Sequence, residues 1–139
     1  MANYTEVKLE GSGKHLESSF SSIAVEFSNI IYKGPLNNEK LNKSIMFRSP
    51  DLKSLLYNLM SKLNELLLND LFLISNVQDL SINMIHNDYM LSSVIIGSKI
   101  KGNEINFSVK EILKNIYIKE DKDGCHIQVN LIVEEKNEV

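Results

Sequence analysis

One histidine and one acid lie close enough together in the chain to do chemistry. His86 and Asp88 stand two residues apart in the segment HND, so both could point the same way at the end of a strand and hold a metal ion or orient a proton transfer. The alternative is that the strand ends there and runs into a turn, because a lone His-Asp pair recurs by chance in many sequences. His15, at the expected entry to a helix, and His126, on the polar face of the last expected strand, carry less information.

Two carboxylates form a second candidate site. Glu6 lies on the first expected strand and Glu134 near the end of the last, and both fall in the outward-facing sets of their strands. If these strands pair, the two acids could share a divalent cation such as Ca²⁺ or Mg²⁺, which prefers hard oxygen ligands. The alternative is ordinary solvated surface charge.

The only cysteine, Cys125, begins an alternating apolar run that continues through Ile127, Val129, Leu131 and Val133. We interpret it as a core residue rather than a catalytic thiol. One cysteine excludes an internal disulfide and is compatible with a reducing cytoplasm. The sequence has no glycine-rich phosphate loop, no paired spacing for zinc and no serine elbow, which disfavours an enzyme of a standard motif class.

Composition is typical of one soluble globular domain, which we place at residues 1–139. Hydrophobic residues make up 43% of the chain and charged residues 24%. The formal net charge is -3 and the lysines alternate with acids, so we expect no direct sequence-specific binding of nucleic acid. The N-terminus lacks the layout of a secretion signal and no apolar run could span a bilayer, so we expect a cytoplasmic protein without membrane contact.

Residues 49–72 carry the strongest periodic pattern and predict a helix. Ser49 can cap its free amides, Pro50 suits the first helical position and Asp51 adds a negative charge to the first turn, while Asn69 and Asp70 close the helix. A leucine stripe of this kind indicates a core helix lying on a sheet, and the alternative is a partner-binding helix. The stripe consists of Leu52, Leu55, Leu56, Leu59, Leu63, Leu66 and Leu67.

The remaining segments predict one more helix and several strands. Residues 4–10 alternate as a half-buried strand, residues 13–32 carry a second helical stripe, residues 33–43 read as an exposed polar connection and residues 44–48 as a short strand. Period-two alternation then continues almost to the end of the chain.

Three further strands follow from that alternation. Leu80, Ile82, Met84 and His86 share one face of the first, Val94 and Ile96 continue the second, and Ile112, Ile116 and Ile118 line the third. Asp123-Gly124 marks a tight turn in the last hairpin. We therefore predict an α+β fold, a mostly antiparallel β-sheet with one face wet and two α-helices packed on the other.

The order of these pieces resembles the archease family over nearly the whole chain. The first helix start reads GKHLESSF from Gly13, and the long helix reads DLKSLL from Asp51 with LNELL from Leu63. Gly97, the Val109-Lys110 pair and the Asp123-Gly124 hairpin stand where the family has its glycine, its Val-Lys entry and its Asp-Gly turn.

This resemblance implies a function. Archeases are accessory proteins that promote guanylylation and turnover of an RtcB-type RNA ligase in tRNA splicing, so the implied partner is that ligase and the protein itself is not an enzyme. The runner-up is a diverged archease-fold module that binds another protein without metal-dependent activity. A third hypothesis, a small hydrolase using Glu6 or the His86-Asp88 pair, lacks a visible nucleophile, base and orienting group.

The resemblance also implies a divalent cation, Ca²⁺ or another, with Glu6 as its ligand. Glu6 stands where the family's first strand has an aspartate, and Asn3 where it has a histidine. Ile132 occupies the place of the second aspartate and supplies no ligand, so Asn130 or Glu134 would have to substitute. On this resemblance the metal site is degenerate.

Overall fold

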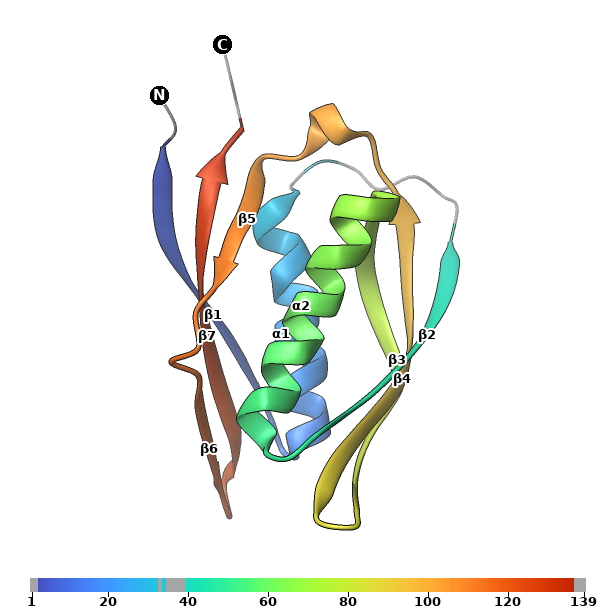
Figure 1. Cartoon of the computed structure of the whole chain (residues 1–139), viewed down its shortest axis with the longest axis vertical. Coiled ribbons are helices and arrows are strands. Elements are labelled where there is room, and N and C mark those ends of the chain that lie inside the picture. The colour runs from blue at the N-terminus through green and yellow to red at the C-terminus, as the bar shows by residue number, and fades with distance from the viewer. Residues whose placement is uncertain (1–2, 33, 35–39, 137–139) are drawn as a thin grey trace.

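Two strand–helix pairs begin the chain, and strands make up most of the remainder (Figure 1). The computed structural model describes residues 3–32, 34 and 40–136. Its elements are, in order, β1 (Tyr4–Gly13), α1 (Leu16–Ile31), β2 (Leu41–Ser49), α2 (Leu52–Asp70), β3 (Phe72–Ile85), β4 (Asp88–Lys99), the short 3-10 helix η1 (Gly102–Glu104), β5 (Phe107–Ile112), β6 (Tyr117–Asp121) and β7 (Gly124–Glu135). The predicted α+β class is confirmed.

The polar connection predicted at residues 33–43 is only partly described. Residues 33 and 35–39 lie outside the described residues. Residues 41–43 belong to β2, so this strand begins at Leu41 rather than at Ser44 as expected. Pairing with β4 extends the strand, since Leu41 lies opposite Gly97.

The strands form two antiparallel sheets rather than the single sheet expected from the sequence. Sheet A contains β1, β7, β5 and β6, and sheet B contains β2, β4 and β3. In sheet A, β5 and β6 follow one another along the side of β7 that lies opposite to β1. Figure 1 shows the two sheets on either side of the helices, and α1 contacts both β1 and β3. Alternation in a sequence predicts which face of a strand is exposed to solvent, but not which strand pairs with it. The division of the strands into two sheets could therefore not be predicted.

Helix α2 buries the predicted leucine stripe, so its identification as a core helix is correct. The stripe packs into the space between the sheets, where α2 contacts β2, β3, β4, β5 and β6. Among the described residues, no helix is long and apolar enough to cross a membrane. The buried residues of α2 are Leu55, Leu56, Leu59, Met60, Leu63, Leu66 and Leu67.

The start of α2 differs from the prediction. Ser49 is the last residue of β2 and does not cap the helix; Asp51 is the N-cap, and its side chain accepts a hydrogen bond from the Ser54 N–H at 2.7 Å. Pro50 therefore precedes the cap instead of opening the helix. The predicted end is correct, because the helix finishes at Asp70 and Leu71 follows in the left-handed conformation with φ 54°.

We expect the Asp51 cap to make stability depend on pH. The hydrogen bond from the Ser54 backbone lowers the pKa of the Asp51 carboxyl, because it favours the charged form. The carboxylate's stabilisation is thus complete above the ordinary aspartate pKa and is lost as the pH falls through the lowered one. Asp51→Ala should lower the urea midpoint at pH 7, and the difference from the parent should shrink towards pH 2.

Asp51→Asn is the matched control, since asparagine caps equally well without a charge. The difference in urea midpoint between Asp51→Asn and Asp51→Ala should not change with pH. A pH-independent difference between Asp51→Ala and the parent would show that the charge of Asp51 contributes nothing.

Helix α1 lies directly on β1 because the strand has no side chain where the two touch. A Cβ at Gly11 would lie 2.5 Å from the Ser19 carbonyl oxygen and 2.8 Å from Ile23 Cβ, which is closer than such atoms can approach. The helix begins after His15, whose N–H donates to Ser18 Oγ at 3.1 Å, as expected for a residue at the helix entry. Its inward face is formed by Leu16, Phe20, Ile23, Ala24, Phe27 and Ile31.

Candidate functional site

The outer face of sheet A carries the two candidate carboxylates. Strands β1 and β7 pair antiparallel, with Glu6 opposite Ile132 and Tyr4 opposite Glu134. The intervening residues of β7 are buried against the helices, so Glu6 and Glu134 lie on the face turned away from them. The first and last strands therefore pair, as a cation site shared by the two acids would require. The two acids lie on neighbouring cross-strand pairs.

Each of these acids already has a partner within the protein. Asn130 Nδ2 donates a hydrogen bond to Glu6 Oε2 at 3.1 Å. Lys110 Nζ lies 3.1 Å from Glu134 Oε1 and forms an ion pair with it. Lys110 reaches Glu134 from β5, where the register shifts between Val109 and Glu111. The side chains therefore form two separate contacts rather than one shared carboxylate site.

These residues do not fit a divalent cation. Calcium takes six to eight oxygen ligands, whereas the position directly across from Glu6 is the hydrocarbon side chain of Ile132. Asn130 turns its N–H towards Glu6, and the Lys110 ammonium compensates the charge of Glu134. Nowhere in residues 3–32, 34 and 40–136 do three or more His, Cys, Asp or Glu side chains group as metal ligands do. Ligation of a metal by Glu6 stays a prediction.

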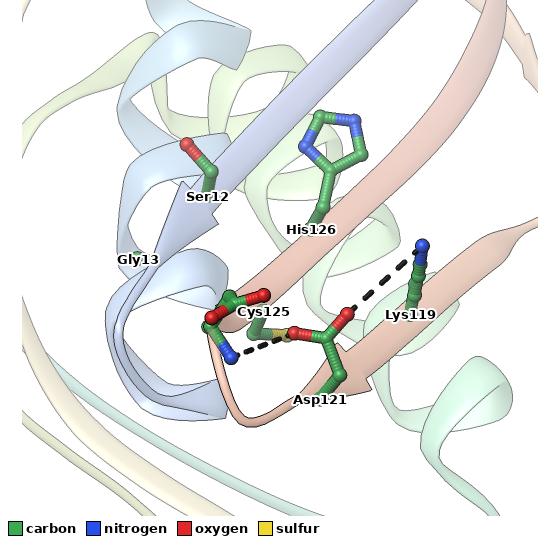
Figure 2. A pocket seen from close by; sticks show the side chains of 8 residues that line it. Ser12, Gly13, Lys119, Asp121, Cys125 and His126 are labelled. Atoms are coloured by element: carbon green, nitrogen blue, oxygen red, sulfur yellow. Dashed lines mark hydrogen bonds and ion pairs between the residues drawn. The ribbon is translucent and has the colours of Figure 1, made fainter.

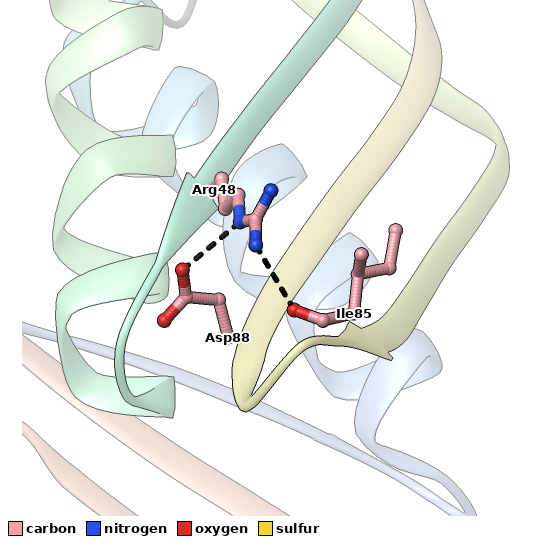
Figure 3. Close-up of polar contacts among 3 residues, drawn as sticks. All are labelled: Arg48, Ile85 and Asp88. Carbon is pink, nitrogen blue, oxygen red and sulfur yellow. Dashed lines mark hydrogen bonds and ion pairs between the residues drawn. The ribbon is translucent and has the colours of Figure 1, made fainter.

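His86 and Asp88, the other candidate pair, lie at the β3–β4 turn (Figure 3). His86 is not on the β3 face predicted for it: β3 ends at Ile85, and His86 and Asn87 both have positive φ, 51° and 72°. Two consecutive left-handed residues make the tight turn of a two-residue hairpin. The alternative of a strand running into a turn is correct.

Arg48 binds that hairpin to β2. Its Nε donates to Asp88 Oδ2 at 2.9 Å, and its Nη2 donates to the Ile85 carbonyl oxygen at 3.1 Å (Figure 3). Within the described part of the chain, His86 has no hydrogen bond or ion pair. The Asp88 carboxylate is thus held by a guanidinium, and it does not orient the imidazole.

A hollow of about 390 Å³ opens further along sheet A, at the β6–β7 hairpin (Figure 2). The predicted hairpin is present, but its turn lies one residue earlier than Asp123-Gly124. Because Asp121 pairs with Gly124, the turn consists of Lys122 and Asp123, and Gly124 opens β7 with φ 139°. Asp121 accepts the Asp123 N–H at 2.8 Å and lies 3.9 Å from Lys119 Nζ. The hollow is lined by Ser12, Gly13, Lys119, Asp121, Asp123, Gly124, Cys125 and His126.

Around this hollow, His126 has polar neighbours but no partner suited to nucleophilic catalysis. Its Nε2 lies 3.8 Å from Glu10 Oε1, and Gln128 donates to the same Glu10 oxygen at 3.1 Å. Ser12 is its cross-strand neighbour, yet no hydrogen bond joins the two side chains among the residues described. The set lacks the nucleophile-to-base contact of a hydrolase.

Cys125 belongs to the core, as predicted. It is 4% exposed and its sulfur accepts a hydrogen bond from Ser19 Oγ at 3.1 Å. Lys119 and Asp121 were missed by sequence reasoning, because a turn at Asp123-Gly124 would pair Lys119 with Gln128, whereas the observed register pairs it with His126. Lys110 was missed because its position depends on an irregularity in β5 that leaves no pattern in the sequence.

The fold and this face together define a class of protein: an α+β domain whose antiparallel sheet presents paired polar side chains on a rigid outer surface. A model described as the Archease protein family (MTH1598/TM1083) matches residues 3–132. The chain belongs to the archease family, a family of non-catalytic accessory proteins, and the resemblance noted in the sequence is confirmed.

A solved structure has the same fold. The solution structure of Methanobacterium thermoautotrophicum protein 1598 superposes with a TM-score of 0.65 at 21% sequence identity. The match covers 96% of this chain and 97% of that chain. No curated protein matches the chain.

Proposed function

We propose that this protein is an accessory factor that promotes guanylylation and turnover of an RtcB-type RNA ligase in tRNA splicing. The observation that carries the proposal is the family match across residues 3–132. In this proposal residues 1–139 form a single archease-like domain that works in the cytoplasm and is not itself an enzyme. It contacts the ligase, and makes neither sequence-specific contacts with RNA nor contacts with a membrane.

Glu6 is the residue through which we propose that the protein acts on the ligase. Its exposed carboxylate stands on a paired strand and is held by Asn130, so its position is fixed before a partner arrives. A preorganised carboxylate can accept hydrogen bonds from a partner or compensate positive charge on it without reorganising. Because the neighbouring residues do not fit a metal ion, we assign no step through one.

Trace amounts of the protein, added to its cognate RtcB-type ligase with GTP and Mn²⁺, should speed formation of the guanylylated ligase over many turnovers. Glu6→Ala should reduce this stimulation by about tenfold, the effect of losing one hydrogen bond to a charged group. Glu26→Ala removes an exposed carboxylate of α1 and should stimulate like the parent. Labelling of the ligase with radioactive GTP measures all three.

The second candidate function is a binding module without metal-dependent activity. It is favoured by Ile132 opposite Glu6 and by the two internal contacts of the acids. An intact protein that binds the ligase and gives no acceleration would establish this function in place of ours. A protein that neither binds nor accelerates would contradict both.

A further inference from the structure

Helix α2 and the free edge of sheet A enclose a groove. Among the described residues, no strand pairs with β5 or β6 on the side away from β7, and α2 contacts both of them (Figure 1). Three hollows, of about 410, 320 and 620 Å³, lie along this boundary. Tyr57 lines both the first and the second, and Lys53 and Ser54 line both the second and the third, so the hollows are adjacent. We call the second and third together the α2–β6 groove.

The edge of β6 supplies one wall with free backbone groups. An edge strand presents unpaired N–H and C=O groups, and an extended peptide can pair with them. Within the described residues, no group other than those of β7 hydrogen-bonds to the β6 backbone. The edge of β5 is less suitable, because the register shift at Lys110 breaks the regular spacing that a paired strand needs.

The groove has an apolar floor, and its charged residues are divided between the hollows: Lys53 and Lys114 line the second, and Asp51 and Glu120 join Lys53 in the third. Ile116 and Ile118 line it from the sheet side. Lys53 approaches from α2 and Lys114 from the sheet side, and Lys114 Nζ lies 5.5 Å from the ring centroid of Tyr57. Neither lysine has an ion pair among the residues described. The second hollow is thus lined by two lysines and no carboxylate, which favours an acidic side chain of the occupant at this end of the groove.

Asn64, in the adjoining hollow, adds a polar group without a partner. Its Oδ1 is shielded from solvent and accepts no hydrogen bond within the described structure. Such an acceptor is satisfied by a donor that enters the hollow, and a peptide continuing past β6 carries one N–H per residue. A net charge of -3 argues against a nucleic acid as the occupant.

We propose that the α2–β6 groove binds an extended acidic peptide segment of another protein, which pairs with the edge of β6 and places a carboxylate between Lys53 and Lys114. This site is separate from Glu6 and does not rest on the ligase function. The apolar side chains of the peptide would pack on Ile116, Ile118 and Tyr57, while its backbone extends sheet A by one strand.

Two pools of capped, fluorescein-labelled decapeptides test the proposal without any ligase. Both alternate Thr, Ser and Val, and they differ only in a central pair of residues, Asp in one pool and Lys in the other. The Asp pool should bind at least about tenfold more tightly by fluorescence anisotropy, and it should slow hydrogen exchange at the amides of residues 117–121. The Lys53→Glu, Lys114→Glu double variant should reverse the preference between the pools.

The matched control reverses two exposed lysines that line neither hollow of the groove, by Lys8→Glu on β1 and Lys14→Glu just after it. It keeps the same net charge as the groove variant, and the Asp pool should bind it as it binds the parent. Thermal melts check that both variants fold, which exposed positions permit. Equal affinity for the two pools, no saturable binding, or exchange protection away from β6 would each overturn the proposal.

Discussion

Leu59→Asp is expected to unfold the protein. Leu59 is 1% exposed at the centre of the α2 stripe and belongs to a core cluster that is hydrophobic throughout the described part of the chain. Burying an unpaired carboxylate there costs several kcal/mol, against a total stability of about 5–15 kcal/mol for an ordinary domain. Far-UV circular dichroism should lose its folded spectrum, or the urea midpoint should fall steeply.

Lys62→Ala on the same helix is the control. Lys62 forms an ion pair with Glu65 at 3.5 Å, and exposed pairs of this kind contribute about 0–1 kcal/mol. This variant should remain folded with nearly the parent's midpoint. If Leu59→Asp were as stable as the parent, the leucine face would have to be exposed in solution, and α2 would be a partner-binding helix after all.

Gly11→Val should be the second strongly destabilising change. The new Cβ would meet the Ser19 carbonyl oxygen, a backbone atom that can move only if α1 moves off β1. Overpacking of this kind costs about 1–3 kcal/mol and more where the neighbour is rigid. The urea midpoint should fall, and the amides of β1 should exchange faster with solvent.

Ser12→Val places the same side chain one residue further along β1, where the position is exposed. It should leave the midpoint within the range of ordinary surface substitutions, about 0.5 kcal/mol. Equal effects at the two positions would mean that valine disturbs the strand itself rather than its contact with α1.

Features set by neighbouring residues could be predicted from the sequence. The leucine stripe of α2 and the last hairpin depend on spacing within a few residues. The stripe occurs where expected, and the hairpin turn lies one residue before Asp123-Gly124. The helix start was missed by two residues because Ser49, Pro50 and Asp51 all suit helix starts. Asp51 becomes the cap because β2 extends through Ser49.

Features that depend on residues far apart in the chain could not be predicted from the sequence. The division into two sheets depends on β1 choosing β7 and on β2 choosing β4, and alternation within a strand contains no information on that choice. For the same reason, the sequence placed Glu6 and Glu134 on the correct face of the sheet but could not predict their contacts. Asn130 donates a hydrogen bond to Glu6, and Lys110 forms an ion pair with Glu134.

The arrangement of sheet A has a consequence for how the chain folds as it is made. Strands β1, β5 and β6 pair with β7 and not with one another, and β7 is the last of the strands to leave the ribosome. Sheet B can assemble earlier, because β2, β3 and β4 are all present by residue 99. Until β7 is made, β1 can pack on α1 but has no strand to pair with, and the long loop closure between β1 and β7 makes sheet A the slow step. In a nascent chain, sheet A therefore stays unassembled until β7 has been made.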